Sequence, residues 1–400
     1  MSKVAFLYAT FPRPTETFVR RELRALEHIE FVPDLYSIWK GADEWEGKTI
    51  NKFYFFKLFT LVFWIPYWAW KKPGAFREIL RELWKNSCPG LQNWNETFLG
   101  LGFALVEAHR FKRKEYSLLH GVWATMPTTA ALGLSELTDV PFSMGAHAYD
   151  VFRSGGDWLL DIKFKRALFV RTSSSSTASR ILKLGVAKRK IKLIRRGLAN
   201  WPVRENFELC SNSRLELISV GRLVEKKGYI HQLKIAKFLL DQSIPFRLRI
   251  VGSGPLSNSL FLESKRMGLE GNIIFTGPKT QKETRELYLH SDIFLFTGVI
   301  AKNGDRDGIP NVVPEAMSAG CLILASCYAG ASEAFVEDVS GFSINPFNTK
   351  DWVDLLVEFW QSPESFVKIR KSAIKHSKEA FNIERTANSF TNAVLNGNLK

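Results

Sequence analysis

Apolar and polar positions along the second half of the chain follow a pattern that predicts a parallel sheet covered by helices. Short apolar runs typical of buried strands occur at residues 215–223, 246–254, 272–278, 292–298 and 321–327. Between them, the stretches 228–243, 256–268 and 282–291 place apolar residues at helical spacing. Strands and helices that alternate in this way build doubly wound sheets, so we predict a Rossmann-like α/β domain here.

The first half shows the same alternation less regularly, with strand-like runs at 3–9, 116–122, 140–148 and 167–173. We therefore expect a second Rossmann-like domain. Gly, Pro and polar residues interrupt the periodicity between 197 and 213, which favours a domain boundary in that segment. The predicted organisation is a first domain over 1–205, a second over 206–375, and a helical segment over 376–400 for which a return to the first domain is one option.

Two segments allow more than one interpretation. Residues 171–180, RTSSSSTASR, follow a strand-like run and precede ILKLG, which favours a loop and a helix N-cap over a linker. Residues 53–70 are the densest aromatic stretch, but Lys57 and Pro66 interrupt them, and 18 residues fall short of the roughly 20 that a membrane-spanning helix needs. A buried core helix and an interfacial helix are both favoured over a spanning helix.

Composition and charge narrow the class of protein. With 46% hydrophobic and 24% charged residues over 400 positions, the chain has the composition of a folded globular protein. The four cysteines show no metal-site or disulfide spacing, and the N-terminus lacks a signal peptide's apolar core, so we expect a cytoplasmic protein. Residues 1–200 hold 31 Lys and Arg against 18 Asp and Glu. Without a zinc finger or an Arg-rich recognition helix, we expect no nucleic acid, and favour an anionic membrane surface or a phosphorylated acceptor.

Candidate chemistry gathers where the predicted strands of the second half end, which is where ligands bind in doubly wound sheets. After the first of these strands, Arg222 and Lys227 stand five residues apart on a turn that Gly228 closes. A planar Arg fork and a Lys point charge together suit a diphosphate. After the second strand, the small residues of GSGP around Gly254 form a loop whose backbone a ligand can approach.

The stretch DRDGIPNVVPEAMSAGC, residues 305–321, is the strongest candidate. After a Gly-Ile-Pro turn, Asn311 is a candidate N-cap for a short helix that closes at Gly320. Asp307 then lies on the loop and Glu315 in or near the first helical turn, so the two carboxylates flank backbone N–H groups. Cations and N–H groups suit the phosphates of a sugar nucleotide, and carboxylates suit its vicinal hydroxyls. Taken singly, each carboxylate is explained as well by the helix dipole or by solvation.

Together these segments resemble the retaining glycosyltransferases of glycosyltransferase family 4, which have the GT-B fold of two Rossmann-like doubly wound domains facing a central cleft. The E-x7-E motif of that family is present as Asp307-x7-Glu315, followed by AMSAG. GRLVEKKG, IVGSGPL, SDIFLFTG and YAGASEAFVEDVSGFSINP also match, and they cover nearly all of 215–350. In the first half, FPRPTETF and FSMGAHAYDVF are similar to segments of exopolysaccharide and colanic-acid-type transferases.

The resemblance implies a role for each matching residue. Arg222 and Lys227 would bind the donor diphosphate, Glu315 the ribose hydroxyls, and Asp307 the transferred sugar. His147 would lie beside that sugar, and the alternative for it is a satisfied core histidine. The further residues that the resemblance implies are Gly254, Ile309, Asn311 and Val312 on the donor side, and Thr15, Glu16 and Asp150 on the acceptor side.

Two departures from the family pattern concern the same loop. Asp307 is one methylene shorter than the usual Glu, and Pro310 removes one N–H. Asp305-Arg306-Asp307 also spells a D-x-D, which suggests a metal site in the other large glycosyltransferase fold. The flanking sequence and the two cations argue against a metal, so we expect a metal-independent enzyme without a cofactor.

The expected function is transfer of a hexose from a nucleoside diphosphate sugar to a hydroxyl of a lipid-linked or polysaccharide acceptor, in exopolysaccharide or cell-surface glycan biosynthesis. The expected location is the cytoplasm, with attachment to the inner face of the cell membrane as an option. Two alternatives stay open: a catalytically decayed GT-B scaffold that binds carbohydrate or lipid, and another GT-B enzyme such as an epimerase or a phosphorylase.

Overall fold

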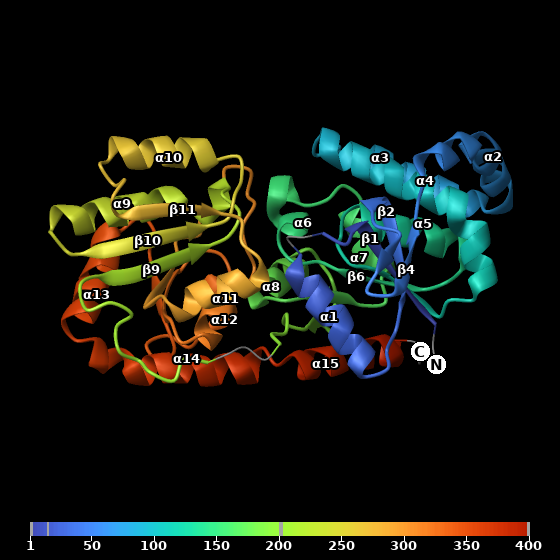
Figure 1. The fold of residues 1–400 in the computed structure, drawn as a ribbon. Helices are drawn as coiled ribbons and strands as arrows, with labels where there is room; N and C mark the ends of the chain where they lie inside the picture. The colour runs from blue at the N-terminus through green and yellow to red at the C-terminus, as the bar shows by residue number, and fades with distance from the viewer. Residues whose placement is uncertain (1–2, 14–15, 200–202, 398–400) are drawn as a thin grey trace. The chain divides into compact units, whose positions relative to one another are not determined.

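The computed structural model describes residues 3–13, 16–199 and 203–397, and Figure 1 shows their helices and strands. The chain divides into two compact units. Unit 1 contains residues 1–195 together with 384–400, and unit 2 contains residues 196–383. Each unit has its own sheet and its own hydrophobic core.

Unit 1 is built on a mostly parallel sheet. Among the described residues its strand order is β3-β4-β2-β1-β5-β6-β7-β8, and β3 runs antiparallel to β4. The central strand β1 pairs on one side with β2, where Ala5 lies beside Asp34, and on the other with β5, where Ala5 lies beside Leu119. The strands are β1 Val4–Phe11, β2 Asp34–Gly41, β3 Glu44–Trp45, β4 Lys48–Lys52, β5 Leu118–Gly121, β6 Phe142–Gly145, β7 Val170–Thr172 and β8 Ile191–Leu193.

Helices pack on both faces of this sheet. On one face, α4 (Leu91–Lys114) and α5 (Met126–Thr138) pack together, and their apolar residues share a core with Ala5 and Leu7 of β1. On the other face, Phe390 of α15 (Ile383–Gly397) meets Phe6 edge-on, with 5.7 Å between ring centroids. The remaining helices of unit 1 are α1 Thr17–His28, α2 Leu61–Lys71, α3 Pro73–Lys85, α6 Tyr149–Phe152, α7 Leu160–Arg166 and α8 Ser175–Lys183.

The structure bears on both segments of the sequence that allowed more than one interpretation. Ser174 caps α8 by accepting a hydrogen bond from the Thr177 amide at 3.3 Å, so the loop-and-N-cap interpretation of 171–180 is confirmed. Residues 53–70 form the 3-10 helix η1 (Phe55–Thr60) and α2, which packs one face against α4 and exposes the other. The expectation of a fully buried core helix is therefore wrong. Across the described ranges, no helix is long and apolar enough to cross a bilayer.

Unit 2 is built on a parallel sheet of strand order β11-β10-β9-β12-β13-β14 among the described residues. Successive residues of a strand point to opposite faces. Accordingly, Leu217 lies in a core shared with α9 and α13, and Ile218 lies in a second core shared with α12 and α14. The strands are β9 Leu215–Val220, β10 Phe246–Val251, β11 Ile273–Gly277, β12 Ile293–Phe296, β13 Leu322–Ser326 and β14 Phe342–Ile344.

The predicted elements of unit 2 are confirmed. All five apolar runs are strands, and the three helical stretches are α9 Tyr229–Asp241, α10 Ser257–Arg266 and α11 Gln281–Leu289. Further helices of this unit are α12 Val312–Ser318, α13 Thr349–Gln361 and α14 Val367–Ala380, and short 3-10 turns include η4 Glu225–Lys227.

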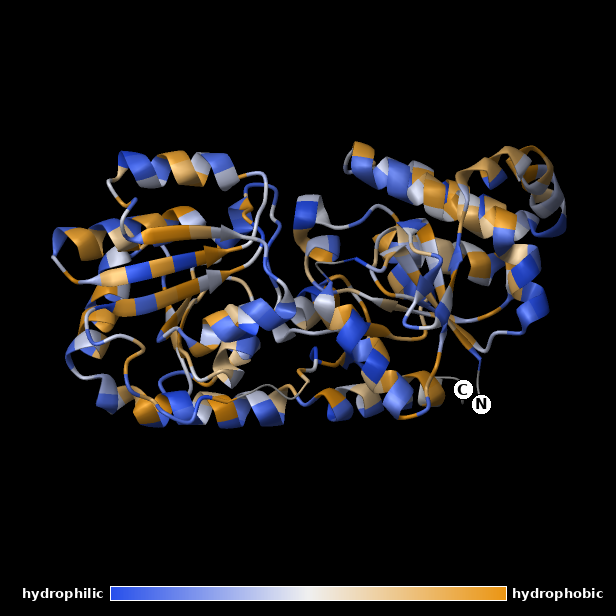
Figure 2. Cartoon of the chain, viewed as in Figure 1, coloured by the Kyte–Doolittle hydropathy of each residue, from blue (hydrophilic) through white to orange (hydrophobic). Residues whose placement is uncertain are grey.

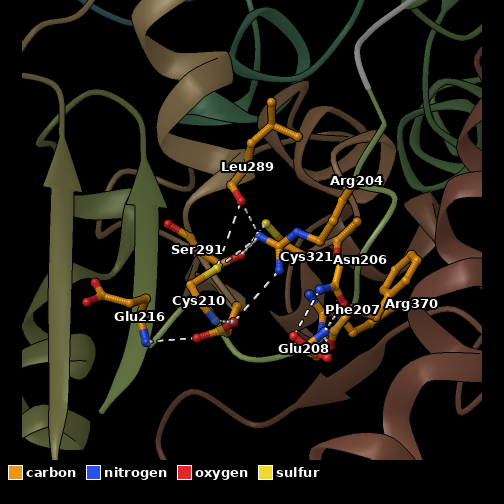
Figure 3. A network of polar contacts seen from close by, with 12 residues as sticks. Arg204, Asn206, Phe207, Glu208, Cys210, Glu216, Leu289, Ser291, Cys321 and Arg370 are labelled. Atoms are coloured by element: carbon orange, nitrogen blue, oxygen red, sulfur yellow. Dashed lines mark hydrogen bonds and ion pairs between the residues drawn. The ribbon is translucent and has the colours of Figure 1, made fainter. Parts of the chain in front are cut away.

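A buried arginine ties the start of unit 2 to its sheet (Figure 3). Arg204 donates hydrogen bonds to the carbonyl oxygens of Leu289 and Ser291, and its guanidinium lies 3.7 Å from the carboxylate of Asp292. Asp292 in turn accepts hydrogen bonds from the backbone amides of Cys210 and Glu216, at 2.9 and 3.1 Å. These contacts fix a segment without regular structure against the beginning of β9 and β12.

Candidate functional site

The loops that follow β9 and β10 are joined backbone to backbone. The amide of Gly221 donates to the carbonyl of Val251 at 3.0 Å, and the amide of Leu223 donates to the carbonyl of Ser253 at 2.9 Å. A side chain at Gly254 would meet the carbonyl oxygen of Leu223 at 2.4 Å. The neighbouring loop therefore fills the space beside Gly254, which gives the small residue a packing role. A ligand contact by Gly254 stays a prediction.

The loop after β12 meets the loop after β9 at Gly228. Gly228 has a φ of +66°, and a Cβ there would lie 1.9 Å from the carbonyl oxygen of Thr297, so only glycine fits. The Thr297 hydroxyl donates to the Gly228 carbonyl at 2.9 Å, and the Val299 amide donates to the Lys226 carbonyl at 2.9 Å. These bonds hold η4 beside the loop that carries the acidic motif.

Two lysines and two aspartates meet there in a compact group, which we call the lysine–aspartate cluster (Lys226, Lys227, Asp305 and Asp307). The Nζ of Lys227 lies 2.8 Å from a carboxylate oxygen of Asp307. The Nζ of Lys226 lies 3.0 Å from Asp305 and 3.5 Å from Asp307. Lys227 also lies over the ring of Phe296 at the end of β12, with its Nζ 5.0 Å from the ring centroid. The cluster therefore stands at the carboxyl ends of β9 and β12, where parallel sheets bind ligands.

The charge state of Asp307 is set by two opposing effects. Burial by itself raises the pKa of Asp307, because a buried carboxylate loses its hydration. The positive charges and hydrogen bonds of Lys227 and Lys226 outweigh burial, and the pKa of Asp307 lies below the ordinary value of an aspartate. Asp307 is therefore ionised at neutral pH and holds ammonium groups at the edge of the sheet.

The helix predicted within 305–321 is α12, which begins at Val312 and ends at Ser318. Asn311 occupies its N-cap position, as expected, but the Asn311 side chain makes no capping hydrogen bond. Glu315 is buried in the first turn, and Gly320 follows the helix in the left-handed conformation. Ligand binding by the amides of Ile309, Asn311 and Val312 and by the Glu315 carboxylate stays a prediction.

In unit 1, the predicted residues His147 and Asp150 lie just beyond the carboxyl end of β6. The Asp150 carboxylate accepts hydrogen bonds from the backbone amides of His147, Ala148 and Ala124, at 3.0, 2.9 and 3.1 Å. Burial raises the pKa of Asp150, and these amide hydrogen bonds oppose the rise. Asp150 therefore shapes the loop that carries His147, whose ring packs edge-on against Trp123 with 5.1 Å between centroids. Contacts of His147 with a sugar and of Asp150 with an acceptor stay predictions.

Of the other acceptor-side residues, Glu16 directly precedes α1. Glu16 occupies the N-cap position of α1, and its amide donates to the carbonyl of Arg13 at 3.1 Å. Its carboxylate lies 3.7 Å from the Arg13 guanidinium. Thr15 lies outside the described residues.

Sequence reasoning assigned only half of the lysine–aspartate cluster. It named Lys227 and Asp307, and it missed Lys226, which is buried and pairs with Asp305 from 79 positions away. The sequence signal for this pairing was that EKKG contains two lysines and DRD contains two aspartates, one for each lysine. Arg222, the other predicted cation, is exposed on the loop after β9 and has no ion-pair partner in the described part of the chain.

The D-x-D carboxylates contact ammonium groups, and this fits poorly with a divalent metal in the same place. Within the described ranges, no group of three or more His, Cys, Asp and Glu side chains could hold a metal ion. The arrangement offers fixed positive charge together with carboxylate acceptors, which is the chemistry that binds phosphates and hydroxyls.

Comparison with known proteins identifies a matching family model and several similar proteins. Residues 206–376 match the model of the family described as Glycosyl transferases group 1. The chain is similar to the "Putative colanic acid biosynthesis glycosyltransferase WcaL" of Escherichia coli K12, 28% identical over 55% of this chain and 54% of that protein. It is also similar to the "Amylovoran biosynthesis glycosyltransferase AmsK" of Erwinia amylovora, 28% identical over 51% of this chain and 50% of that protein. The chain thus spans about half the length of the curated relatives it matches.

Solved structures of GT-B proteins share the fold. Anabaena HepE in complex with UDP aligns with a TM-score of 0.70 and 15% identity over 98% of this chain and 100% of that one. Sucrose-phosphate synthase from Thermosynechococcus elongatus aligns with a TM-score of 0.71 and 13% identity over 98% of each chain. The predicted α/β GT-B fold with two parallel-sheet units is therefore confirmed. The family match is to a glycosyltransferase family, and both of these relatives carry the names of glycosyltransferases.

Proposed function

We propose that this protein is a retaining glycosyltransferase of family 4 that transfers a hexose from a nucleoside diphosphate sugar to a hydroxyl of a lipid-linked or polysaccharide acceptor. The lysine–aspartate cluster carries the proposal, because it sets ammonium groups at the carboxyl ends of two neighbouring parallel strands. The names of WcaL and AmsK support the polysaccharide context. HepE structures with UDP and with UDP-glucose support a uridine nucleotide as the first donor to test.

In this proposal, each chemical group of the nucleotide sugar has a binding partner in the protein. Lys227 and Arg222 bind the diphosphate, and Lys227 keeps its contact with Asp307, because an ammonium group has three donors. The amides at the start of α12 donate to the same phosphates. Glu315 accepts hydrogen bonds from the ribose, and Asp307 accepts them from the sugar. Asp305 acts through Lys226, which it holds beside Asp307.

The proposed reaction breaks the bond between the anomeric carbon and the diphosphate oxygen, and it forms a bond between that carbon and the acceptor oxygen. Retention follows when the acceptor attacks the face from which the diphosphate leaves. The acceptor proton then passes to the leaving phosphate oxygen. Arg222 and Lys227 stabilise the negative charge that gathers on the diphosphate, and fixed charges of this kind are worth several kcal/mol. With two cations in these positions, the proposed step uses no metal.

The test is a panel of nucleotide sugars, first in a thermal unfolding assay and then in a transfer assay with lipid-linked and glycan acceptors. We expect one nucleotide to raise the melting temperature, and the variant with Arg222→Ala and Lys227→Ala to lose that rise. Binding without transfer to any acceptor would favour a decayed scaffold, and donor conversion without an acceptor would favour an epimerase. If no nucleotide raises the melting temperature of the wild type, the proposal is wrong.

A further inference from the structure

The outward face of η1 and α2 is apolar although it is exposed. Phe59, Phe63 and Trp70 are 84%, 73% and 81% exposed, and Phe56 and Val62 are 66% and 67% exposed. We call these five residues the aromatic crest. In Figure 2, α2 carries mostly orange and pale residues. Contiguous exposed apolar surface on a folded protein usually marks an interaction site.

The opposite face of α2 already has its packing partners. Trp68 is buried and donates its indole N–H to the carbonyl of Leu105 in α4 at 2.9 Å. Trp64 stacks on His109 of the same helix, with 4.6 Å between ring centroids. A surface helix normally has one apolar face, toward the core, and a polar face toward water. Helix α2 has two apolar faces, so folding of the described chain satisfies only one of them.

Basic residues border the aromatic crest. Between positions 53 and 85 the chain holds six Lys and Arg against two Asp and Glu. Lys71 directly follows the crest, with its Nζ 5.0 Å from the ring centroid of Tyr67. Lysine beside Trp and Tyr is the combination that settles at the headgroup boundary of a membrane.

A second basic element lies on α3, which packs against α2. Arg77 and Arg81, one helical turn apart, line a hollow together with Gly74 and Glu78. The only acid among these four residues, Glu78, is paired with Arg166. Arg81 lies 3.7 Å from the carboxylate of Glu82, whereas Arg77 has no ion-pair partner among the described residues, so Arg77 supplies the unpaired positive charge of the hollow. We call these two residues with Lys71 the basic border (Lys71, Arg77 and Arg81).

We propose that the aromatic crest and the basic border dock unit 1 on an anionic lipid bilayer. The crest side chains enter the boundary between headgroups and acyl chains, and the basic border meets anionic headgroups. Helix α2 has 11 residues, about 16 Å at 1.5 Å per residue, and the hydrocarbon core is about 30 Å thick, so the helix lies in one leaflet. This docking proposal adds a membrane surface to the proposed function. It rests on the proposed function in one respect only, namely that the acceptor is linked to a lipid.

Charge favours a bilayer over a second copy of this chain. Anionic headgroups complement the basic border, whereas a second copy would bring the same excess of positive charge to the interface. Self-association through the crest is nevertheless a distinct outcome, and it can be measured separately.

The experiment is sedimentation of the full chain with vesicles of phosphatidylcholine alone or with one quarter phosphatidylglycerol, at low and high salt. The crest variant carries Phe59→Ser and Trp70→Ser, and its matched control replaces two exposed apolar residues elsewhere, Val32→Ser and Leu262→Ser. The border variant changes three basic residues to Gln, and its control removes the same charge from the end of α8 and the 3-10 turn Lys188–Lys190 that follows it. The border variant has K71Q, R77Q and R81Q, and its control has K183Q, K188Q and R189Q.

We expect wild type and both controls to bind anionic vesicles, with binding that falls as salt rises. The crest variant should lose about tenfold or more in vesicle affinity at every salt concentration, because its loss is apolar area. The border variant should lose its preference for anionic vesicles and keep weak binding to neutral ones. All replaced side chains are exposed, so circular dichroism and melting temperature should match wild type.

Negligible vesicle binding by wild type would overturn the proposal, as would equal losses in the crest variant and its control. A wild-type dimer that the crest variant converts to a monomer, without vesicle binding, would assign the crest to a second copy. Binding of UDP is measured in the same proteins without lipid. Failure of docking with intact UDP binding rejects only this inference, and failure of UDP binding with intact docking rejects only the proposed function.

Discussion

Substitution Lys227→Met tests whether the lysine–aspartate cluster is a diphosphate site. Methionine keeps an apolar chain over the ring of Phe296 and removes the ammonium group. Lys226 stays 3.5 Å from Asp307 in the variant, so the buried carboxylate keeps a counter-ion and the loop keeps an anchor. We therefore expect the variant to fold.

The magnitude follows from the surroundings of Lys227. Its side chain is 12% exposed, so a contact with phosphate forms largely out of water. A hydrogen bond to a charged partner contributes about 1.5–3 kcal/mol, and 1.4 kcal/mol corresponds to a factor of ten in affinity. We expect the dissociation constant of UDP to rise about 10- to 150-fold.

Titration calorimetry with UDP and with uridine checks this expectation. Uridine lacks the diphosphate, so its affinity should be the same in Lys227→Met and in wild type. Lys234→Met, which removes an exposed lysine from α9, is the matched control and should leave both affinities unchanged. If UDP binds the folded Lys227 variant as tightly as wild type, or if uridine weakens as much as UDP, the reasoning is refuted.

Three further predictions concern donor recognition, acid stability and folding. Glu315→Gln should weaken the binding of free UDP as well as of UDP-sugar, whereas Asp307→Asn should leave UDP binding unchanged and impair sugar transfer. If calorimetry shows that both substitutions weaken UDP binding equally, this division of roles is contradicted. Because the pKa of Asp307 is lower in the folded chain than its unfolded value of about 3.9, its stabilising contribution is present above about pH 4 and lost as pH falls through the folded pKa. Asp307→Asn should therefore flatten that part of a curve of unfolding free energy against pH, and an unchanged curve would show that the carboxylate adds no net stability. Arg204→Met should cost about 3 kcal/mol in urea unfolding, because it leaves buried carbonyls without a donor and removes the cation beside the buried carboxylate of Asp292, whereas the exposed Lys282→Met should cost almost nothing.

Strands and helices of unit 2 could be predicted because their pattern is local. Strands such as β9 and β12 have near-continuous apolar runs, since both faces of the sheet are covered. In unit 1, the strands β2 and β4 gave no such signal: β4 reads KTINK, with a single buried residue, Ile50. A strand of this kind is defined by its pairing with β2 on one side and β3 on the other, and it cannot be recognised from its own residues.

The candidate site was predictable where it follows a motif and unpredictable where it depends on contacts between loops. Lys227 and Asp307 belong to recognisable segments. Lys226 and Asp305 do not reveal their pairing in the sequence, because contacts distant in sequence, such as that between Gly228 and Thr297, bring the two loops together. The same limit applies to Asp150. Its position in a motif suggested a contact with the acceptor, but in the structure its carboxylate accepts hydrogen bonds from three backbone amides.

In the loops at the carboxyl edge of the unit 2 sheet, one set of groups fixes the position of the loops and another set carries the charge. Backbone bonds and close glycine contacts fix where the loops lie, and this leaves the charged side chains available for binding. Buried ion pairs contribute little net stability, because desolvation offsets their attraction. The lysine–aspartate cluster as a whole therefore stabilises the fold little more than apolar residues of similar size would, although its lysines favour ionised over neutral Asp307. Under the proposed function, its ammonium groups are already held in place before a phosphate binds, so binding and bond cleavage would need little reorganisation of charge, which is the condition under which electrostatic stabilisation is most effective.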